Sequence, residues 1–108
     1  MNEGTRGAGG AERRARPRIP VVGFAEVKTR RGTLVGEAVD VSAAGVCLTI
    51  PQPLVAGELC SLDLRIENEP PIETSIVGRV CFCIEQSAGY RIGVNCPMSD
   101  SFDQLSQR

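Results

Sequence analysis

Arginines that could bind an anion are concentrated near the start of the chain, where Arg13 precedes an Arg-x-x-x-Arg pair, Arg14 and Arg18. A guanidinium group is planar and carries a fork of donors, so it can bind a phosphate through paired hydrogen bonds and can also stack on a base. Residues 1–31 contain eight basic and three acidic residues, a net charge of +5, whereas residues 32–108 contain four and ten, a net charge of -6. This asymmetry indicates an anionic partner for the basic segment. A solvated basic tail is the alternative interpretation.

A second group of functional side chains is Asp40-x-Ser42-x-x-Gly45. The pattern predicts a turn, because Asp and Ser hydrogen-bond to nearby backbone amides and Gly adopts positive φ readily. A carboxylate also accepts hydrogen bonds from the N–H groups on the Watson–Crick edge of guanine, and a hydroxyl can donate to a phosphate or a base. Guanine in turn presents O6 and N7 to an arginine fork. A ligand with guanine and phosphate fits both groups; an ordinary inter-strand turn is the alternative.

Apolar and polar residues alternate along most of the chain from Val21, which predicts short strands. Six runs show this pattern, separated by turn residues: 21–28, 33–41, 46–50, 60–66, 72–84 and 90–96. Parity groups Val35 and Val39 with Val41 in the second run and Phe82 with the core residue Val80 in the fifth, where Gly78 suggests a bend or bulge. Pro97 ends the sheet, and Ser99 or Asp100 is expected to cap a short helix through Gln107 whose apolar face carries Phe102 and Leu105.

Six short strands with frequent turns predict an all-β fold, an antiparallel barrel or sandwich. We expect a six-stranded antiparallel barrel with a short C-terminal helix and a flexible N-terminal arm. Barrel closure is favoured because it leaves no exposed sheet edges.

Several function classes are disfavoured by composition. The chain has no histidine, which removes the commonest general base and the usual partner of a nucleophilic Ser or Cys. Five cysteines are present without a Cys-x-x-Cys pair, and an enzyme or a zinc site is not expected. Cys81 and Cys83 share a predicted strand face, so a metal or redox role is conceivable, but we interpret them as small hydrophobic residues. No apolar run is long enough to span a bilayer.

Taken together and in this order, the two groups resemble the signature of the PilZ domain family, which is Arg-x-x-x-Arg, then about twenty to thirty residues, then Asp/Asn-x-Ser-x-x-Gly. Arg14 and Arg18 match the first part of this signature. Asp40, Ser42 and Gly45 match the second part, with 21 residues between Arg18 and Asp40.

The resemblance extends over residues 12–98 and includes Gly-Arg-Val at 78–80 and Tyr-Arg-Ile-Gly-Val at 90–94. PilZ domains bind the bacterial second messenger cyclic di-GMP, so the resemblance implies a non-enzymatic receptor for this ligand. It implies six ligand-binding residues: Arg13, Arg14, Arg18, Asp40, Ser42 and Gly45. In the family, an Arg immediately before the motif accompanies a stacked pair of ligand molecules. Where relatives often carry Trp near the ligand, this chain has Phe82.

We therefore expect a disordered tail (1–11) and a PilZ domain (12–108), which divides into a ligand-binding arm (12–20), the barrel (21–96) and the final helix (99–107). The expected partners are cyclic di-GMP, singly or as a stacked pair, and an unidentified downstream protein in motility, biofilm or exopolysaccharide control. We expect no cofactor, metal, nucleic acid or membrane insertion, a cytoplasmic location, and a monomer or weak dimer. Two alternatives stay open: a ligand-free PilZ-type adaptor for protein contacts, and a nucleic-acid binder that uses the basic arm.

Overall fold

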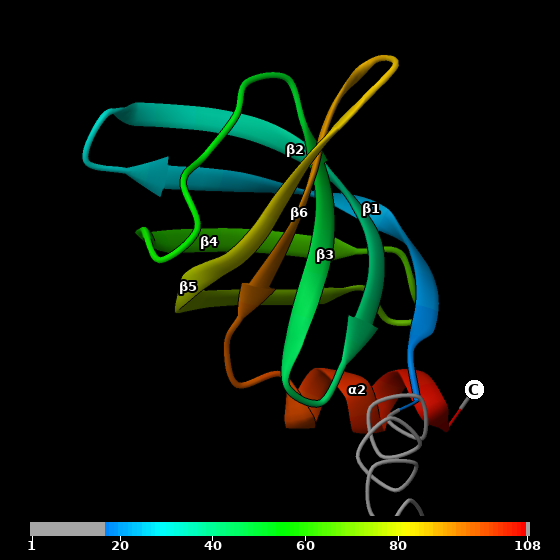
Figure 1. The fold of residues 1–108 in the computed structure, drawn as a ribbon. Helices are drawn as coiled ribbons and strands as arrows, with labels where there is room; N and C mark the ends of the chain where they lie inside the picture. The colour runs from blue at the N-terminus through cyan, green and yellow to red at the C-terminus, as the bar shows by residue number, and fades with distance from the viewer. Residues whose placement is uncertain (1–16, 108) are drawn as a thin grey trace, which may run out of the picture.

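The computed structural model describes residues 17–107, which form six strands and one helix. In chain order these are β1 (Ile19–Thr29), β2 (Gly32–Ser42), β3 (Gly45–Ile50), β4 (Leu59–Ile66), β5 (Ile72–Gln86), β6 (Gly89–Asn95) and α2 (Ser99–Ser106). The strands form a closed antiparallel barrel in the order β1-β2-β3-β6-β5-β4, with β4 hydrogen-bonded back to β1 (Figure 1). The predicted six-stranded antiparallel barrel with a short C-terminal helix is confirmed. The tail and most of the predicted arm lie outside the described residues.

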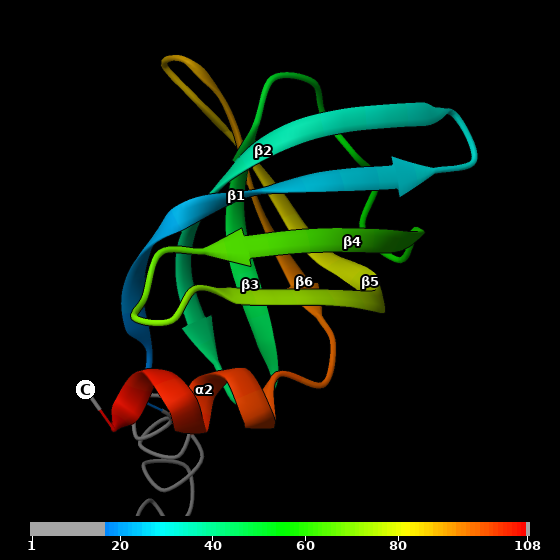
Figure 2. The ribbon, with the colours of Figure 1, turned by 180° about the vertical axis from the view of Figure 1, so that it is seen from behind.

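The barrel interior is filled by aliphatic side chains, as the alternating pattern predicts. Strand β4 shows this most clearly, because its residues are alternately exposed and buried. The buried residues are Cys60, Leu62, Leu64 and Ile66. Full burial of one such side chain contributes about 1.5–3 kcal/mol. Helix α2 lies across one end of the barrel, as the view from behind shows (Figure 2), and buries Leu105 there, while Phe102 packs partly against the same core.

The helix begins differently from the expectation. Met98 occupies the N-cap position and makes no side-chain capping hydrogen bond, so neither Ser99 nor Asp100 caps the helix. Met98 is buried, and its carbonyl accepts the backbone N–H of Phe102 at 2.8 Å. Apolar packing of Met98 at this end therefore replaces the predicted side-chain cap. Within residues 17–107, no helix has the length and apolar character needed to cross a membrane.

Two β-bulges alter which side chains face outward. In β2 the register with β3 shifts between Ala38 and Asp40, and in β5 the register with β6 shifts between Val80 and Phe82. Because one extra residue reverses the facing of all residues beyond it, the simple parity prediction fails past each bulge. Val35 is 60% exposed although Val41, which shares its parity, is buried. The prediction that these two valines share a face is wrong.

The bulge in β5 falls at Cys81 rather than at Gly78, which pairs in regular register with Cys60. Val80 therefore points into the core while Phe82 and Ile84 point away from it. Cys83 faces inward and packs against the core, whereas Cys81 is exposed. The predictions that Phe82 is a core residue and that Cys81 and Cys83 share a face are both wrong.

Candidate ligand-binding site

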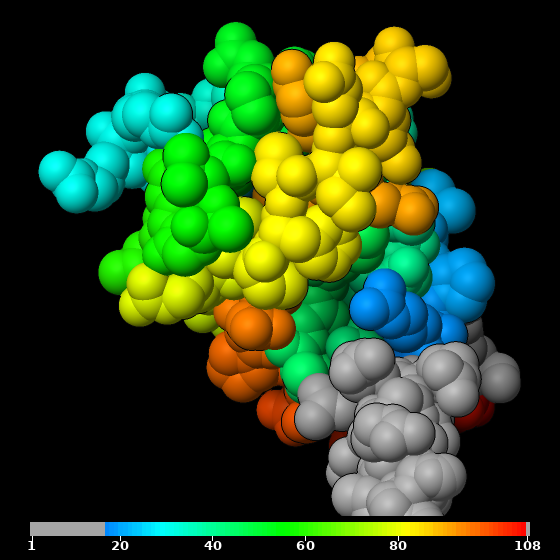
Figure 3. Space-filling view, viewed as in Figure 1, coloured from blue at the N-terminus to red at the C-terminus, as the bar shows by residue number. Residues whose placement is uncertain are grey.

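A row of four paired residues crosses the outer face of β2, β3, β6 and β5. Asp40 pairs with Cys47, Cys47 with Gly93, and Gly93 with Phe82. A hollow of about 190 Å³ lies over this row. Figure 3 shows this face of the molecule, where β3 lies at the bottom of a depression between the start of β1 and β5. The row brings together polar, small and aromatic side chains from strands that are distant in sequence.

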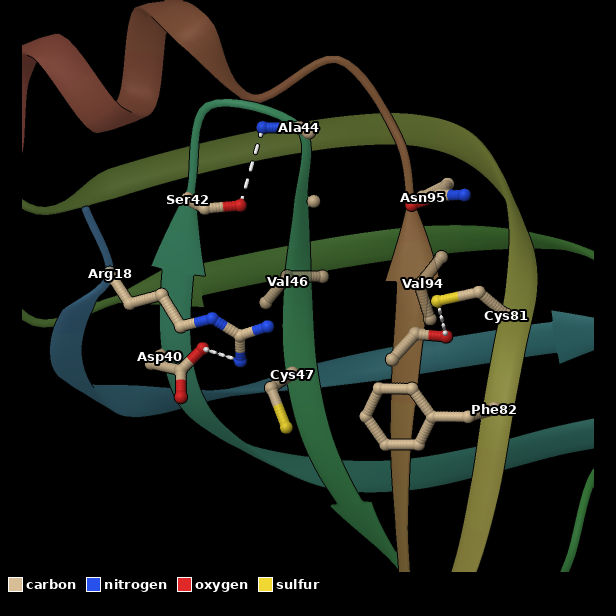
Figure 4. A pocket seen from close by; sticks show the side chains of 12 residues that line it. Arg18, Asp40, Ser42, Ala44, Val46, Cys47, Cys81, Phe82, Val94 and Asn95 are labelled. Carbon is tan, nitrogen blue, oxygen red and sulfur yellow. Dashed lines mark hydrogen bonds and ion pairs between the residues drawn. The ribbon is translucent and has the colours of Figure 1, made fainter. Parts of the chain in front are cut away.

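Arg18 and Asp40 form one wall of the hollow. Arg18 precedes β1 directly, and the pairing of Ile19 with Val41 and of Pro20 with Asp40 places this end of the chain beside β2. The guanidinium Nη1 of Arg18 lies 3.6 Å from the Asp40 carboxylate Oδ1 (Figure 4). The Arg18 side chain is 62% exposed and that of Asp40 is 21% exposed, so both are accessible to a ligand.

Ser42 and Gly45 lie at the end of the hollow nearest to the β2–β3 turn. The turn itself contains only Ala43 and Ala44, because Ser42 and Gly45 are already paired strand residues. The predicted turn over residues 40–45 is therefore too long, and Asp40 is a strand residue. Ser42 Oγ accepts a hydrogen bond from the Ala44 backbone N–H at 3.3 Å, as expected for a serine that stabilises a turn. Its hydroxyl hydrogen remains available to a ligand.

The reason for glycine at position 45 differs from the expectation. Positive φ occurs at Gly32, Gly57 and Gly89 among the described residues, and Gly45 does not share this conformation. Instead, a Cβ at Gly45 would stand 2.2 Å from the Val94 carbonyl oxygen. The glycine lets β3 approach β6 closely, so its part in the site is to shape the surface beside Ser42.

Phe82 forms the wall opposite Arg18. Its ring lies over Gly93, where a Cβ would stand 2.3 Å from Phe82 Cε2. Figure 4 shows the Arg18 guanidinium and the Phe82 ring on opposite sides of the hollow, with Cys47 between them. Sequence parity assigned Phe82 to the core and did not single out Gly93. The bulge that turns Phe82 outward has no signal in the sequence that could have predicted it.

Two thiols, of Cys47 and Cys81, also line the hollow. Cys47 is only 4% exposed but does not belong to the core cluster, since it lies on the outer face beneath the hollow. Burial raises the pKa of the Cys47 thiol, and the Asp40 carboxylate adds to the rise while Arg91 and Arg18 oppose it. The Cys81 thiol donates to the Gly93 carbonyl at 3.2 Å. Among residues 17–107, no cluster of side chains is suited to hold a metal ion.

Four of the six residues predicted for the site line this hollow: Arg18, Asp40, Ser42 and Gly45. Arg13 and Arg14 lie outside the described residues. The structure adds Phe82, Cys47, Cys81 and Asn95, and the small surface of Gly93, to the lining.

A closed six-stranded barrel with a cation, a carboxylate, a hydroxyl and an aromatic ring around one outer hollow defines a small β-barrel binding module. The sequence model of the PilZ domain matches residues 12–107, nearly the whole chain. The chain belongs to the PilZ domain family, whose members are in general non-enzymatic receptors for cyclic di-GMP. No curated protein matches the chain.

Proposed function

We propose that this PilZ domain binds cyclic di-GMP in the hollow over Asp40, Cys47, Gly93 and Phe82, and relays binding to a partner protein. The observation that carries this proposal is the position of the Arg18 guanidinium 3.6 Å from the Asp40 carboxylate at the edge of the hollow. A cation and an anion side by side match a ligand that presents both acceptors and donors. Guanine presents acceptors at O6 and N7 and N–H donors on its Watson–Crick edge.

Each residue around the hollow recognises a different part of the ligand. Asp40 accepts from the guanine N–H groups, Arg18 donates to guanine O6 and N7 or to a phosphate, and Ser42 donates to a phosphate. The Phe82 ring gives a base a surface for stacking. A site made only of cations would bind any polyanion, whereas the Asp40 carboxylate repels phosphate and selects for a base with donors.

The exposed Arg18–Asp40 pair presents little obstacle to a ligand. Ion pairs between exposed side chains contribute about 0–1 kcal/mol, so a ligand can separate this pair at small cost. Hydrogen bonds to charged groups contribute about 1.5–3 kcal/mol each, which exceeds that cost. The pair therefore holds Arg18 beside the hollow without preventing its transfer to a ligand.

The hollow accommodates only part of a cyclic dinucleotide. Pockets for drug-sized ligands measure about 300–1,000 Å³, compared with about 190 Å³ here. We propose that the hollow holds one guanine and its neighbouring phosphate, while Arg13 and Arg14 bind the remainder or a second, stacked ligand molecule. Arg14 precedes Arg18 by four residues in the sequence and Arg13 by five.

One set of titrations separates this function from its two alternatives. Cyclic di-GMP, GTP and a short DNA duplex are titrated calorimetrically into the protein at low and high salt. We expect saturable binding of cyclic di-GMP in preference to the other two at both salt concentrations. DNA binding that falls steeply with salt, without guanine preference, would instead indicate the basic-arm nucleic-acid binder. If none of the three ligands binds, the result would support the alternative of a ligand-free adaptor for protein contacts.

The downstream protein is expected to recognise the surface that the ligand changes. Ligand bound over Gly93 would separate Arg18 from Asp40 and cover the outer face of β3 and β6. We propose that a partner in motility, biofilm or exopolysaccharide control reads this change. Amide exchange in residues 12–20 that stays the same when cyclic di-GMP is added would count against this relay.

A further inference from the structure

A second arginine, Arg91, lies on β6 next to the hollow's lining residue Gly93, although it does not line the hollow itself. It lies two residues before Gly93, and both face the outside of the barrel, because Ile92 between them is buried in the core. Alternate residues on one strand face are about 7 Å apart, within reach of an arginine side chain. Arg91 pairs with Thr49 on β3 and with Ile84 on β5. It therefore belongs to the row next to Asp40, Cys47, Gly93 and Phe82.

One guanidinium nitrogen of Arg91 makes no hydrogen bond within the described part of the chain. This nitrogen is Nε, and it is buried. Other arginines of the barrel have partners: Arg18 with Asp40, Arg31 with Glu58, Arg65 with Glu73, and Arg79 with the Gly57 carbonyl. No carboxylate in this part of the chain lies within ion-pair distance of Arg91. A buried donor without a protein acceptor is costly, and a ligand acceptor that reached the Arg91 guanidinium would remove this cost.

Arg91 lies close enough to the hollow to influence the Cys47 thiol in its floor. Burial and the Asp40 carboxylate raise the pKa of the Cys47 thiol, and Arg91 and Arg18 both oppose this rise. Arg18 approaches this thiol from the side of β2, whereas Arg91 projects from β6. Two cations thus lie near the same thiol in the floor of the hollow, Arg18 from the segment before β1 and Arg91 from β6.

We propose that Arg91 is a further ligand-binding residue that binds a phosphate of the cyclic dinucleotide through its guanidinium fork. The inference rests on the proposed function, and it extends the site from the hollow to the adjacent row. In this arrangement, the guanine lies between Asp40 and Phe82 and the phosphate lies above Gly93, where no side chain intervenes. A planar fork fits two phosphate oxygens, which a lysine at this position would not reproduce.

Calorimetric titration of cyclic di-GMP into four proteins tests the proposal: the wild type, Arg91→Met, Arg91→Lys and Arg30→Met. Methionine keeps an unbranched side chain but removes both the charge and the buried donor. Arg30 is an exposed residue of the β1–β2 turn, so Arg30→Met is a charge-matched control. We expect Arg91→Met to weaken binding about ten- to hundredfold, as for the loss of one charge-assisted hydrogen bond, and Arg30→Met to bind as the wild type does. Arg91→Lys should fall between them.

Thermal unfolding without ligand separates a ligand contact from a structural role. Because Arg91→Met removes a buried donor that has no acceptor, the melting temperature of the ligand-free variant should equal or exceed that of the wild type. A lower melting temperature for both Arg91 variants would assign Arg91 to the fold and overturn the inference. Wild-type affinity in Arg91→Met would overturn it as well, while the proposed function would stand. If the wild type itself binds no cyclic di-GMP, the proposed function and this inference fail together.

Discussion

The Phe82 ring lies directly over Gly93, so closely that a Cβ on Gly93 would stand 2.3 Å from Phe82 Cε2. Three local features produce this contact: the bulge at Cys81, the missing side chain at position 93, and the pairing of β5 with β6. The result is an aromatic surface facing a cation and a carboxylate across a hollow only two strands wide. Phe82 is therefore a wall of the hollow, whereas its parity in the sequence predicts a core residue.

Phe82→Ala should weaken binding of cyclic di-GMP by about 1–3 kcal/mol, because base–aromatic stacking contributes about that amount per base. The measurement is calorimetric titration. Phe24→Ala is the matched control, since Phe24 is exposed on β1 and does not line the hollow. Equal affinities for Phe82→Ala and Phe24→Ala would show that the ring does not contact the ligand.

Gly45→Ala should destabilise the barrel by about 1–3 kcal/mol, because the new Cβ would stand 2.2 Å from the Val94 carbonyl and would push β3 away from β6. Urea unfolding followed by circular dichroism gives the difference in the free energy of unfolding. An unchanged unfolding midpoint would mean that the β3–β6 contact is looser than described and that glycine at this position serves the ligand alone.

Stability should fall at alkaline pH because of buried thiols. Burial raises the pKa of the Cys96 thiol to about 11 from an ordinary value of 9.0, and the nearby Cys60 adds to the rise. A raised pKa in the folded state means that folding favours the neutral thiol. This contribution is complete below pH 9 and is lost as the pH rises toward 11. It corresponds to roughly 2–3 kcal/mol, since one pKa unit is about 1.4 kcal/mol.

Urea unfolding of the wild type and Cys96→Ala across this pH range checks the prediction. The variant starts from lower stability, because the cavity left by the sulfur is unfilled, but its stability should decline less steeply with pH. Parallel decline of the two proteins would assign the alkaline loss to other groups.

Arg18→Ala should leave the fold intact. The Arg18–Asp40 pair is largely exposed, so its loss should change the free energy of unfolding by less than about 1 kcal/mol. The same variant should show no measurable binding of cyclic di-GMP. Urea unfolding and calorimetric titration of one protein preparation give both values. A large loss of stability would mean that the binding defect results from a disturbed fold.

The sequence was sufficient to predict the barrel because its strands alternate strictly where they are half-buried. Strand β4, from Leu59 to Ile66, alternates without interruption, and its buried face was predicted residue by residue. The predictions failed where one extra residue enters a strand, at Val39 and at Cys81. A bulge depends on how two strands meet in space, and the residues that form it here carry no local signature.

The residues of the candidate site also fall into those that the sequence could identify and those that it could not. Arg18, Asp40, Ser42 and Gly45 could be selected from residue type and spacing, and the structure gathers them at one hollow. Gly93 and Arg91 could not, because their relevance arises from cross-strand pairing between β3, β6 and β5. Phe82 was singled out only by the resemblance to the family, while its parity assigned it to the core. Arg91 in particular is one arginine among several in the sequence, and what distinguishes it among residues 17–107 is a buried Nε without an acceptor.

The most direct test of the account is calorimetric titration of cyclic di-GMP into the wild type, Arg14→Ala, Arg18→Ala and Asp40→Ala. We expect saturable binding to the wild type, no measurable binding to either arginine variant, and weakened binding to Asp40→Ala. Binding to Arg18→Ala with wild-type affinity, in a variant that remains folded, would contradict the assignment of the ligand to this hollow.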